Sequence, residues 1–106
     1  MTDRISAIQA MLAKSPDDVF LRYSLGMEYA ASQQYEQALA AFRKCIELDA
    51  DYVAAYVEAG KSLRSLGRLD EARETFTAAL TSADKLSEGH TANYIRAQIA
   101  GLPRKT

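Results

Sequence analysis

The sequence predicts an all-α fold, a superhelix of stacked antiparallel helix hairpins, and three observations lead to this prediction. Identical residues recur thirty-four positions apart, at Gly26 and Gly60, Ala38 and Ala72, and Phe42 and Phe76. Apolar residues around these pairs have the spacing of amphipathic helices. Almost half of the residues (48%) are apolar, and the two prolines, Pro16 and Pro103, lie outside the repeated region. A fixed period of this size is typical of chains built from repeated helical hairpins.

Two consecutive units, residues 19–52 and 53–86, account for this period. Small residues occupy positions where two helices have to approach closely, and bulky residues fill the remaining space. The residues expected to pack the repeats are Leu25, Gly26, Tyr29, Ala38, Phe42 and Cys45 in the first unit, and Tyr56, Gly60, Leu63, Ala72, Phe76 and Ala79 in the second.

This pattern resembles the tetratricopeptide repeat, in which a bulky residue, Leu-Gly, Tyr, Ala, Phe and Pro recur every thirty-four residues. The sequence departs from the family at Arg22, where Trp is usual, at Ala59, where the second Leu is usual, and at Ala50 and Asp84, where Pro is usual. The resemblance implies a right-handed solenoid. It also implies that the first helices of the repeats line a concave side that binds peptides.

Before the first repeat, residues 3–14 are expected to form the second helix of an incomplete repeat. Ile8 and Leu12 have helical spacing, and Pro16 falls where the closing Pro of a preceding repeat would lie. Inside the repeats, Gly67 marks a turn because Gly tolerates the left-handed conformation that ends many helices, and Gln33-Gln34 marks the equivalent turn. Asp51 is the expected N-cap of the helix that starts the second repeat.

After the second repeat, the apolar series that begins at Ala72 continues past the repeat boundary. We therefore expect an overlong helix that ends at Gly89, followed by a capping helix over residues 91–100, so that residues 87–102 complete the fold. Residues 103–106 are the expected flexible tail. The chain is predicted to be one domain, residues 1–106.

Composition and charge favour some partners over others. The net charge is −1 and no block of like charge exceeds three residues, so nothing provides the steady phosphate neutralisation that nucleic acids require. No apolar run approaches the ~18 residues that cross a bilayer. Asp3 and Gln9 interrupt a stretch that faintly resembles a signal peptide, and a single Cys fits a reducing compartment. We expect a cytoplasmic protein with neither a nucleic acid nor a membrane as partner.

Candidate chemistry is sparse in this sequence. Cys45 occupies a repeat position that needs a small residue, so a buried structural thiol is favoured over a nucleophile. His90 has no second His or Cys with which to form a zinc site. Asp49 and Asp51 suggest a calcium loop, but Gly60 stands where that loop requires Glu. Since no phosphate loop or nucleophile elbow is present, we expect no enzymatic activity, no cofactor and no metal ion.

The first helix of the first repeat is apolar on both faces, which is typical of a helix that is buried or has a partner. The corresponding face of the second repeat adds two cations to an apolar floor. The expected peptide-binding residues are Phe20, Tyr23, Met27, Ala30, Val57, Lys61 and Arg64. Apolar anchors would supply desolvation, and the cations would bind an acidic side chain or a C-terminal carboxylate. The favoured function is a non-enzymatic interaction module, an adaptor or scaffold.

A cryptic enzyme or small-molecule binder stays open as a further function class, although no set of residues supports it. Two alternatives to a peptide-binding face also remain open for the first repeat helix. In the first, Phe20 and Tyr23 only pack against the half-repeat helix near the N-terminus. In the second, the apolar face of the first repeat helix pairs with a second copy of the chain, which would make a weak homodimer and a self-assembling structural module.

Overall fold

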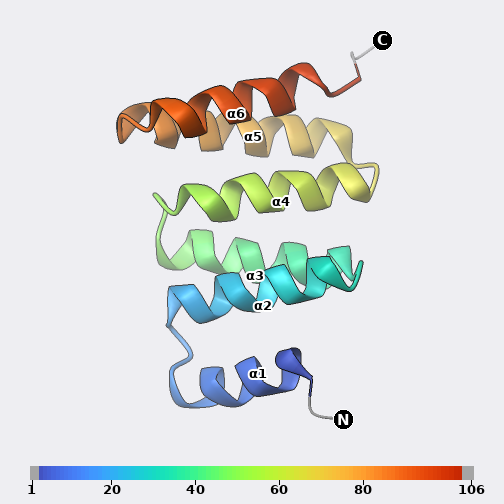
Figure 1. Cartoon of the computed structure of the whole chain (residues 1–106), viewed down its shortest axis with the longest axis vertical. Coiled ribbons are helices and arrows are strands. Elements are labelled where there is room, and N and C mark those ends of the chain that lie inside the picture. Colours follow the sequence, from blue (N-terminus) through green and yellow to red (C-terminus); the bar gives the residue numbers. More distant parts are fainter. Residues whose placement is uncertain (1–2, 104–106) are drawn as a thin grey trace.

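The computed structural model describes residues 3–103, and these form six α-helices and no strand (Figure 1). The helices are α1 (Arg4–Lys14), α2 (Val19–Ala31), α3 (Tyr35–Leu48), α4 (Val53–Ser65), α5 (Leu69–Lys85) and α6 (Gly89–Ala100). Each helix packs mainly on its neighbours in the chain, and α2 also touches α4. The prediction of an all-α solenoid is confirmed.

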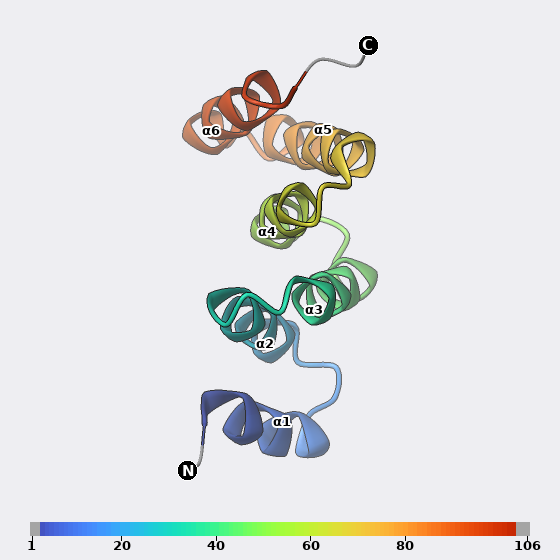
Figure 2. The ribbon, with the colours of Figure 1, turned by 90° about the vertical axis from the view of Figure 1, so that its right-hand side faces the viewer.

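The helices stack along the longest of three axes, which measure 44, 29 and 20 Å. Figure 2 shows α2, α4 and α6 along one side of this stack and α3 and α5 along the other, with α1 at the end next to α2. We call the surface formed by α2, α4 and α6 the A face, and the surface formed by α3 and α5 the B face. Two repeats and their flanking helices therefore present two separate long surfaces.

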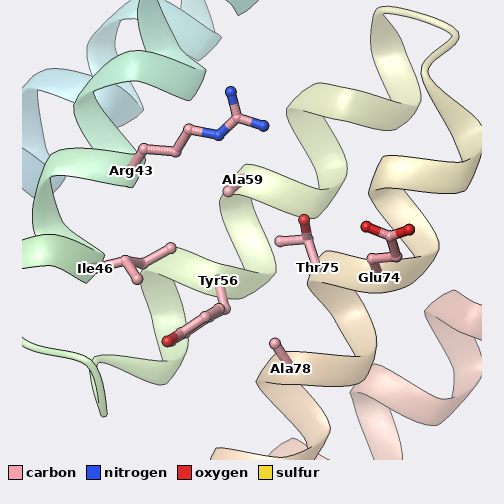
Figure 3. A pocket seen from close by; sticks show the side chains of 7 residues that line it. All are labelled: Arg43, Ile46, Tyr56, Ala59, Glu74, Thr75 and Ala78. Atoms are coloured by element: carbon pink, nitrogen blue, oxygen red, sulfur yellow. The ribbon is translucent and has the colours of Figure 1, made fainter.

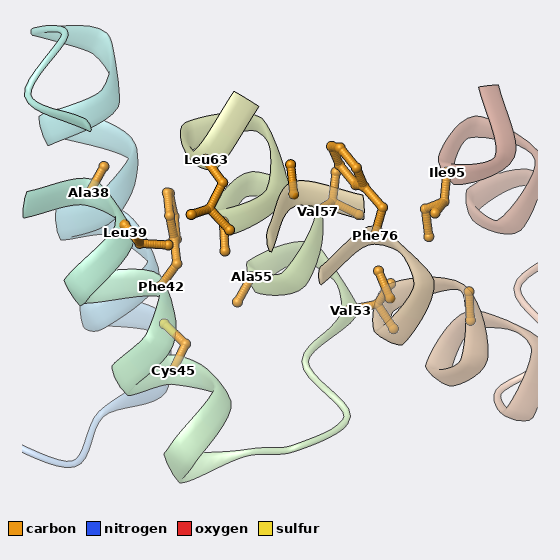
Figure 4. Packing of buried hydrophobic residues seen from close by; sticks show 14 of the residues in the cluster. Ala38, Leu39, Phe42, Cys45, Val53, Ala55, Val57, Leu63, Phe76 and Ile95 are labelled. Carbon is orange, nitrogen blue, oxygen red and sulfur yellow. The ribbon is translucent and has the colours of Figure 1, made fainter. Parts of the chain in front are cut away.

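The core depends on a close approach between the two helices of each hairpin. A methyl group at Gly26 would lie 2.5 Å from Cε1 of Phe42, and one at Gly60 would lie 2.6 Å from Cε1 of Phe76. Both rings are fully buried. Figure 4 shows Phe42 and Phe76 among the buried side chains between the helices, with Ile95 of α6 beyond Phe76. The expectation that small residues mark helix contacts is confirmed at both glycines.

The helix near the N-terminus agrees with its expected range within one residue. Asp3 is the N-cap of α1, and its Oδ1 accepts a hydrogen bond of 2.7 Å from the backbone N–H of Ser6. Ile8 and Leu12 of α1 form a small cluster with Leu25 and Ala41. This cluster fixes the half-repeat helix on α2 and α3.

Three turns each contain one residue in the left-handed backbone conformation. The angle φ is 61° at Gln33, 76° at Gly67 and 59° at Ser87. In each case the next residue donates its N–H to a carbonyl oxygen five positions earlier, as from Glu88 to Ala83 at 2.8 Å. The turns inside both hairpins are therefore confirmed, and the connection from α5 to α6 uses the same geometry.

The predicted end of the long helix is wrong. Helix α5 has 17 residues against 14 in α3, so it is overlong, but it ends at Lys85 and not at Gly89. The left-handed Ser87 stops it, and Gly89 is the first residue of α6, which begins two residues before the expected Thr91. An apolar periodicity indicates which face is buried, but it does not show where a polar residue adopts the left-handed conformation.

The predicted N-cap of α4 is also wrong. Tyr52 occupies that position without a side-chain hydrogen bond. Asp51 lies one residue further from the helix, and its carboxylate pairs with Lys85 Nζ at 3.1 Å. At the other end of the chain, the carbonyl oxygen of Pro103 accepts a hydrogen bond from Arg73, and residues 104–106 of the expected tail lie outside the described residues.

Gly60→Ala is expected to lower the free energy of unfolding by on the order of 1–3 kcal/mol, because the added methyl group overpacks the site against the ring of Phe76. Helix propensity alone predicts the opposite sign, a gain of ~1 kcal/mol. Gly89→Ala is the matched control, since nothing lies within 4 Å of a methyl group there. Urea unfolding measured by circular dichroism compares the two variants, and equal stabilities would contradict the assigned contact.

Candidate functional site

The helices of the A face carry three of the five large apolar side chains that are exposed in the described chain. These three are Phe20 (63% exposed), Met27 (37%) and Tyr94 (45%). The other two are Met11 on α1 and Leu86 in the turn after α5. Phe20 and Met27 are seven residues apart, two turns of α2, and therefore lie on the same side of that helix.

A first pocket of about 320 Å³ lies between α2 and α4. Its α2 wall is apolar and includes Met27 and Ala30, while its α4 wall carries Glu58, Lys61 and Arg64. We call it the α2–α4 pocket. It brings together four of the seven residues that the sequence predicted for peptide binding.

A second pocket of about 310 Å³ lies between α4 and α6, and we call it the α4–α6 pocket. Ala54 and Val57 of α4 line it together with His90, Thr91 and Tyr94 of α6. Glu58 also lines this pocket and so belongs to both. Val57 is only 6% exposed, so this predicted residue forms part of the floor.

Both predicted cations already have partners. Lys61 Nζ lies 3.4 Å from Oε2 of Glu58, and Nη1 of Arg64 donates to Oε1 of Gln98 at 2.5 Å. The guanidinium carbon of Arg64 lies 6.0 Å from the ring centroid of Phe76, within the range of a cation–π interaction. The charge of Lys61 is therefore balanced by Glu58 of the same helix. Arg64 instead connects α4 to α5 and α6 through its contacts with Phe76 and Gln98.

Tyr23 contributes mainly to packing. Its ring centroid lies 5.7 Å from that of Phe42 and 5.5 Å from that of Tyr52. Burial raises the pKa of its phenol, and the negative charge of Glu58 adds to this shift. Tyr23 thus stands next to the A face and braces α2 against α3.

The first alternative for the apolar face of α2 is wrong. Helix α1 packs on the opposite side of α2, through Leu21, Leu25 and Tyr29. Phe20 remains the most exposed large apolar side chain of the described chain. Packing against the half-repeat helix therefore does not explain why an aromatic residue stands at this position.

Sequence reasoning missed Glu58 and Tyr94. Glu58 could have been found, because it precedes Lys61 by three residues and so lies next to it on α4. Tyr94 had no such signal, because its position on the A face depends on the length of α5 and on the turn at Ser87.

A third pocket, of about 270 Å³, lies on the B face (Figure 3). Tyr56 and Ala59 of α4 form its floor, and α3 and α5 form its walls. Arg43 stands on the α3 wall, and its Nη2 lies 3.6 Å from Oε1 of Glu71. None of the exposed large apolar side chains lines this pocket, so the A face is the stronger candidate site.

Cys45 is buried within the first repeat. Its Sγ donates to the carbonyl oxygen of Val19 at 3.5 Å, and burial raises the pKa of the thiol to about 11. Only a thiolate is a strong nucleophile or metal ligand, so this position favours a structural role. Within residues 3–103, no group of three or more His, Cys, Asp and Glu side chains could hold a metal ion.

None of the helices described here combines the length and the apolar character needed to span a membrane.

The fold and its paired glycine contacts define a helical-repeat protein of the class that serves as protein–protein interaction modules. A family model of the tetratricopeptide repeat matches residues 23–87 and 58–100. The chain belongs to the tetratricopeptide repeat family.

Similar proteins agree with this assignment. A TPR repeat-containing protein of Pseudomonas aeruginosa is 31% identical over 96 residues, 87% of this chain and 91% of that protein. Anaphase-promoting complex subunit 3 of Dictyostelium discoideum is 30% identical over 95% of this chain, which spans 10% of that protein. A solved structure from Bordetella parapertussis has a TM-score of 0.83 at 27% identity, over 94% of this chain and 87% of that one. The TPR2B domain of yeast Sti1 shares the fold, with a TM-score of 0.85 at 24% identity over 91% of this chain and 77% of that one.

The Cys45 thiol is expected to react slowly with an aromatic disulfide reagent at pH 8 in the native protein and rapidly in urea. Its raised pKa keeps it protonated, and the packed hairpin excludes the reagent. The measurement is the rate at which the reagent releases its aromatic thiolate, followed by absorbance. Equal rates in the two conditions would show that the thiol is accessible and would reopen the case for a reactive cysteine.

Proposed function

We propose that this chain is a non-enzymatic adaptor whose A face binds an extended or helical peptide segment of a partner protein. The observation that carries the proposal is the exposure of Phe20, Met27 and Tyr94 on this one face. Apolar side chains gathered on a surface are typical of interaction sites. We place this activity in the cytoplasm, since a single Cys without a disulfide partner fits a reducing compartment.

The α2 side of the face would supply the apolar contacts. Met27 and Ala30 line the α2–α4 pocket, and Phe20 stands two turns of helix before Met27. An unbranched, polarizable Met side chain adapts its shape to different partners. Large apolar anchors that lose contact with water carry much of the binding energy in interfaces.

The α4 side would bind an acidic side chain or a C-terminal carboxylate. Lys61 has three N–H donors and Arg64 has five, so the contacts to Glu58 and Gln98 leave donors available in each cation. Charged groups of this kind give orientation and register more than affinity. The solved structure of the yeast Sti1 TPR2B domain is a complex with pHsp70, which supports partner binding by a solenoid of this fold.

Self-association is the second candidate function, and the same exposed side chains favour it. A two-fold dimer would reuse one surface on both copies, so Phe20 and Met27 would pack against their counterparts. The two functions compete for the same face. Light scattering distinguishes them, because only the dimer doubles the mass in solution.

Met27→Ala is expected to weaken binding of peptides about tenfold, because it removes an apolar anchor from the α2–α4 pocket. The peptides come from a random display library selected on the wild-type protein, and fluorescence anisotropy measures their affinity. Met11→Ala is the matched control, since Met11 is equally an exposed methionine but lies on α1.

Two results would contradict the proposal. The first is equal loss of affinity in Met27→Ala and Met11→Ala, which would show that the A face has no special role. The second is a stable dimer that buries Phe20 and Met27, which would leave no face for a peptide and would favour self-association.

A further inference from the structure

Glu58 stands between the two pockets of the A face. Its side chain is only 18% exposed and lines both pockets. Within the described chain its one ion pair is with Lys61, at 3.4 Å through Oε2. An ionised carboxylate has roughly four lone-pair positions, so a single long contact leaves most of its accepting capacity unused. A half-buried carboxylate in this condition favours the approach of a second cation.

The shape of the α4–α6 pocket suits a Lys or Arg side chain of a partner. Ala54 and Val57 offer apolar surface to the aliphatic stem, since long cationic side chains bury their stems and keep their charged ends at polar groups. Glu58 would receive the charged end, and the ring of Tyr94 adds a cation–π interaction. No Lys or Arg among residues 3–103 lines the pocket, so no permanent positive charge of the described chain repels a cation there.

The α2–α4 pocket has the opposite preference. Lys61 and Arg64 both line it, against the single acidic group of Glu58. A partner cation that enters on the other side of α4 would pair with Glu58 and weaken the Glu58–Lys61 ion pair. Lys61 would then be available to bind an acidic group. The two pockets are therefore complementary to a basic group and an acidic group of the same segment.

The position of the pockets sets the distance between these groups. The pockets flank α4, so their centres are separated by about one helix width, ~10 Å. An extended chain advances ~3.3 Å per residue, so three residues cover this distance.

We infer that the A face selects a partner segment in which a Lys or Arg stands about three residues from an Asp or Glu, with the basic side chain in the α4–α6 pocket against Glu58. The inference rests on the proposed function and adds the chemistry of the partner. It makes Glu58 a specificity-determining residue of the face.

Parallel selections from a random peptide display library test this inference. The wild-type protein is expected to enrich peptides with the basic and acidic residues at this spacing. Glu58→Gln keeps the size of the side chain and removes its charge, so it is expected to lose the enrichment of Lys and Arg. Glu47→Gln is the matched control, because Glu47 is exposed on α3 and forms no ion pair within residues 3–103; it is expected to select like the wild type.

A second measurement uses the wild-type protein and one selected peptide. Replacing the basic residue of that peptide by norleucine keeps the aliphatic stem and removes the charge. Binding to the wild type is expected to weaken about tenfold, the effect of a close interfacial charge pair. Binding to Glu58→Gln is expected to weaken clearly less than binding to the wild type, because the charge pair is already absent and only the cation–π interaction with Tyr94 is lost.

The outcomes keep the two proposals apart. Peptides that bind the A face, are weakened by Met27→Ala and show no basic enrichment would overturn the inference and leave the proposed function in place. An equal norleucine effect in wild type and Glu58→Gln would do the same. If no selected peptide responds to Met27→Ala, the proposed function fails, and the inference fails with it.

Discussion

The contact between a glycine of the first helix and a phenylalanine of the second sets the geometry of each hairpin. Gly26 meets Phe42 and Gly60 meets Phe76, and in both hairpins the ring occupies the space that any side chain on the glycine would need. Because the contact recurs after thirty-four residues, the second hairpin repeats the first with a constant step. This step aligns α2, α4 and α6 along one side of the solenoid (Figure 2).

The same contact explains why the A face is available for display. The two buried rings, Phe42 and Phe76, come from α3 and α5, and α2 and α4 present a glycine to each ring beside larger core residues such as Leu63. Their outer sides are then free to carry Phe20, Met27 and the Glu58–Lys61 pair. Surface ion pairs contribute much less than these buried contacts. The ion pairs of Arg68 with Glu36 and Glu71 are partly exposed, and such pairs add little to the free energy of unfolding.

Much of the fold could be predicted, because the spacing of small and bulky apolar residues along the sequence shows which helix faces are in contact. The helix near the N-terminus, both hairpins and both intra-hairpin turns follow from residues such as Ile8, Gly60 and Gly67. The end of α5 could not be predicted, because Ser87 carries no sequence signal for its left-handed conformation. The candidate site was predicted less well. Helical periodicity placed Met27 and Lys61 on one face, but pairing with Glu58 depends on side-chain positions that a single periodicity does not contain.

A double-mutant cycle between Gly26 and Phe42 tests the central contact most directly. Gly26→Ala and Phe42→Leu are made singly and together, and urea unfolding gives the four free energies. If the ring fills the space at the glycine, the smaller Leu relieves the overpacking by the added methyl group. The free energy of unfolding of the double variant is then higher, by about 1 kcal/mol or more, than the value expected from adding the two single-variant losses. Simple additivity of the two changes would contradict the account, because it would mean that the two side chains do not share this space.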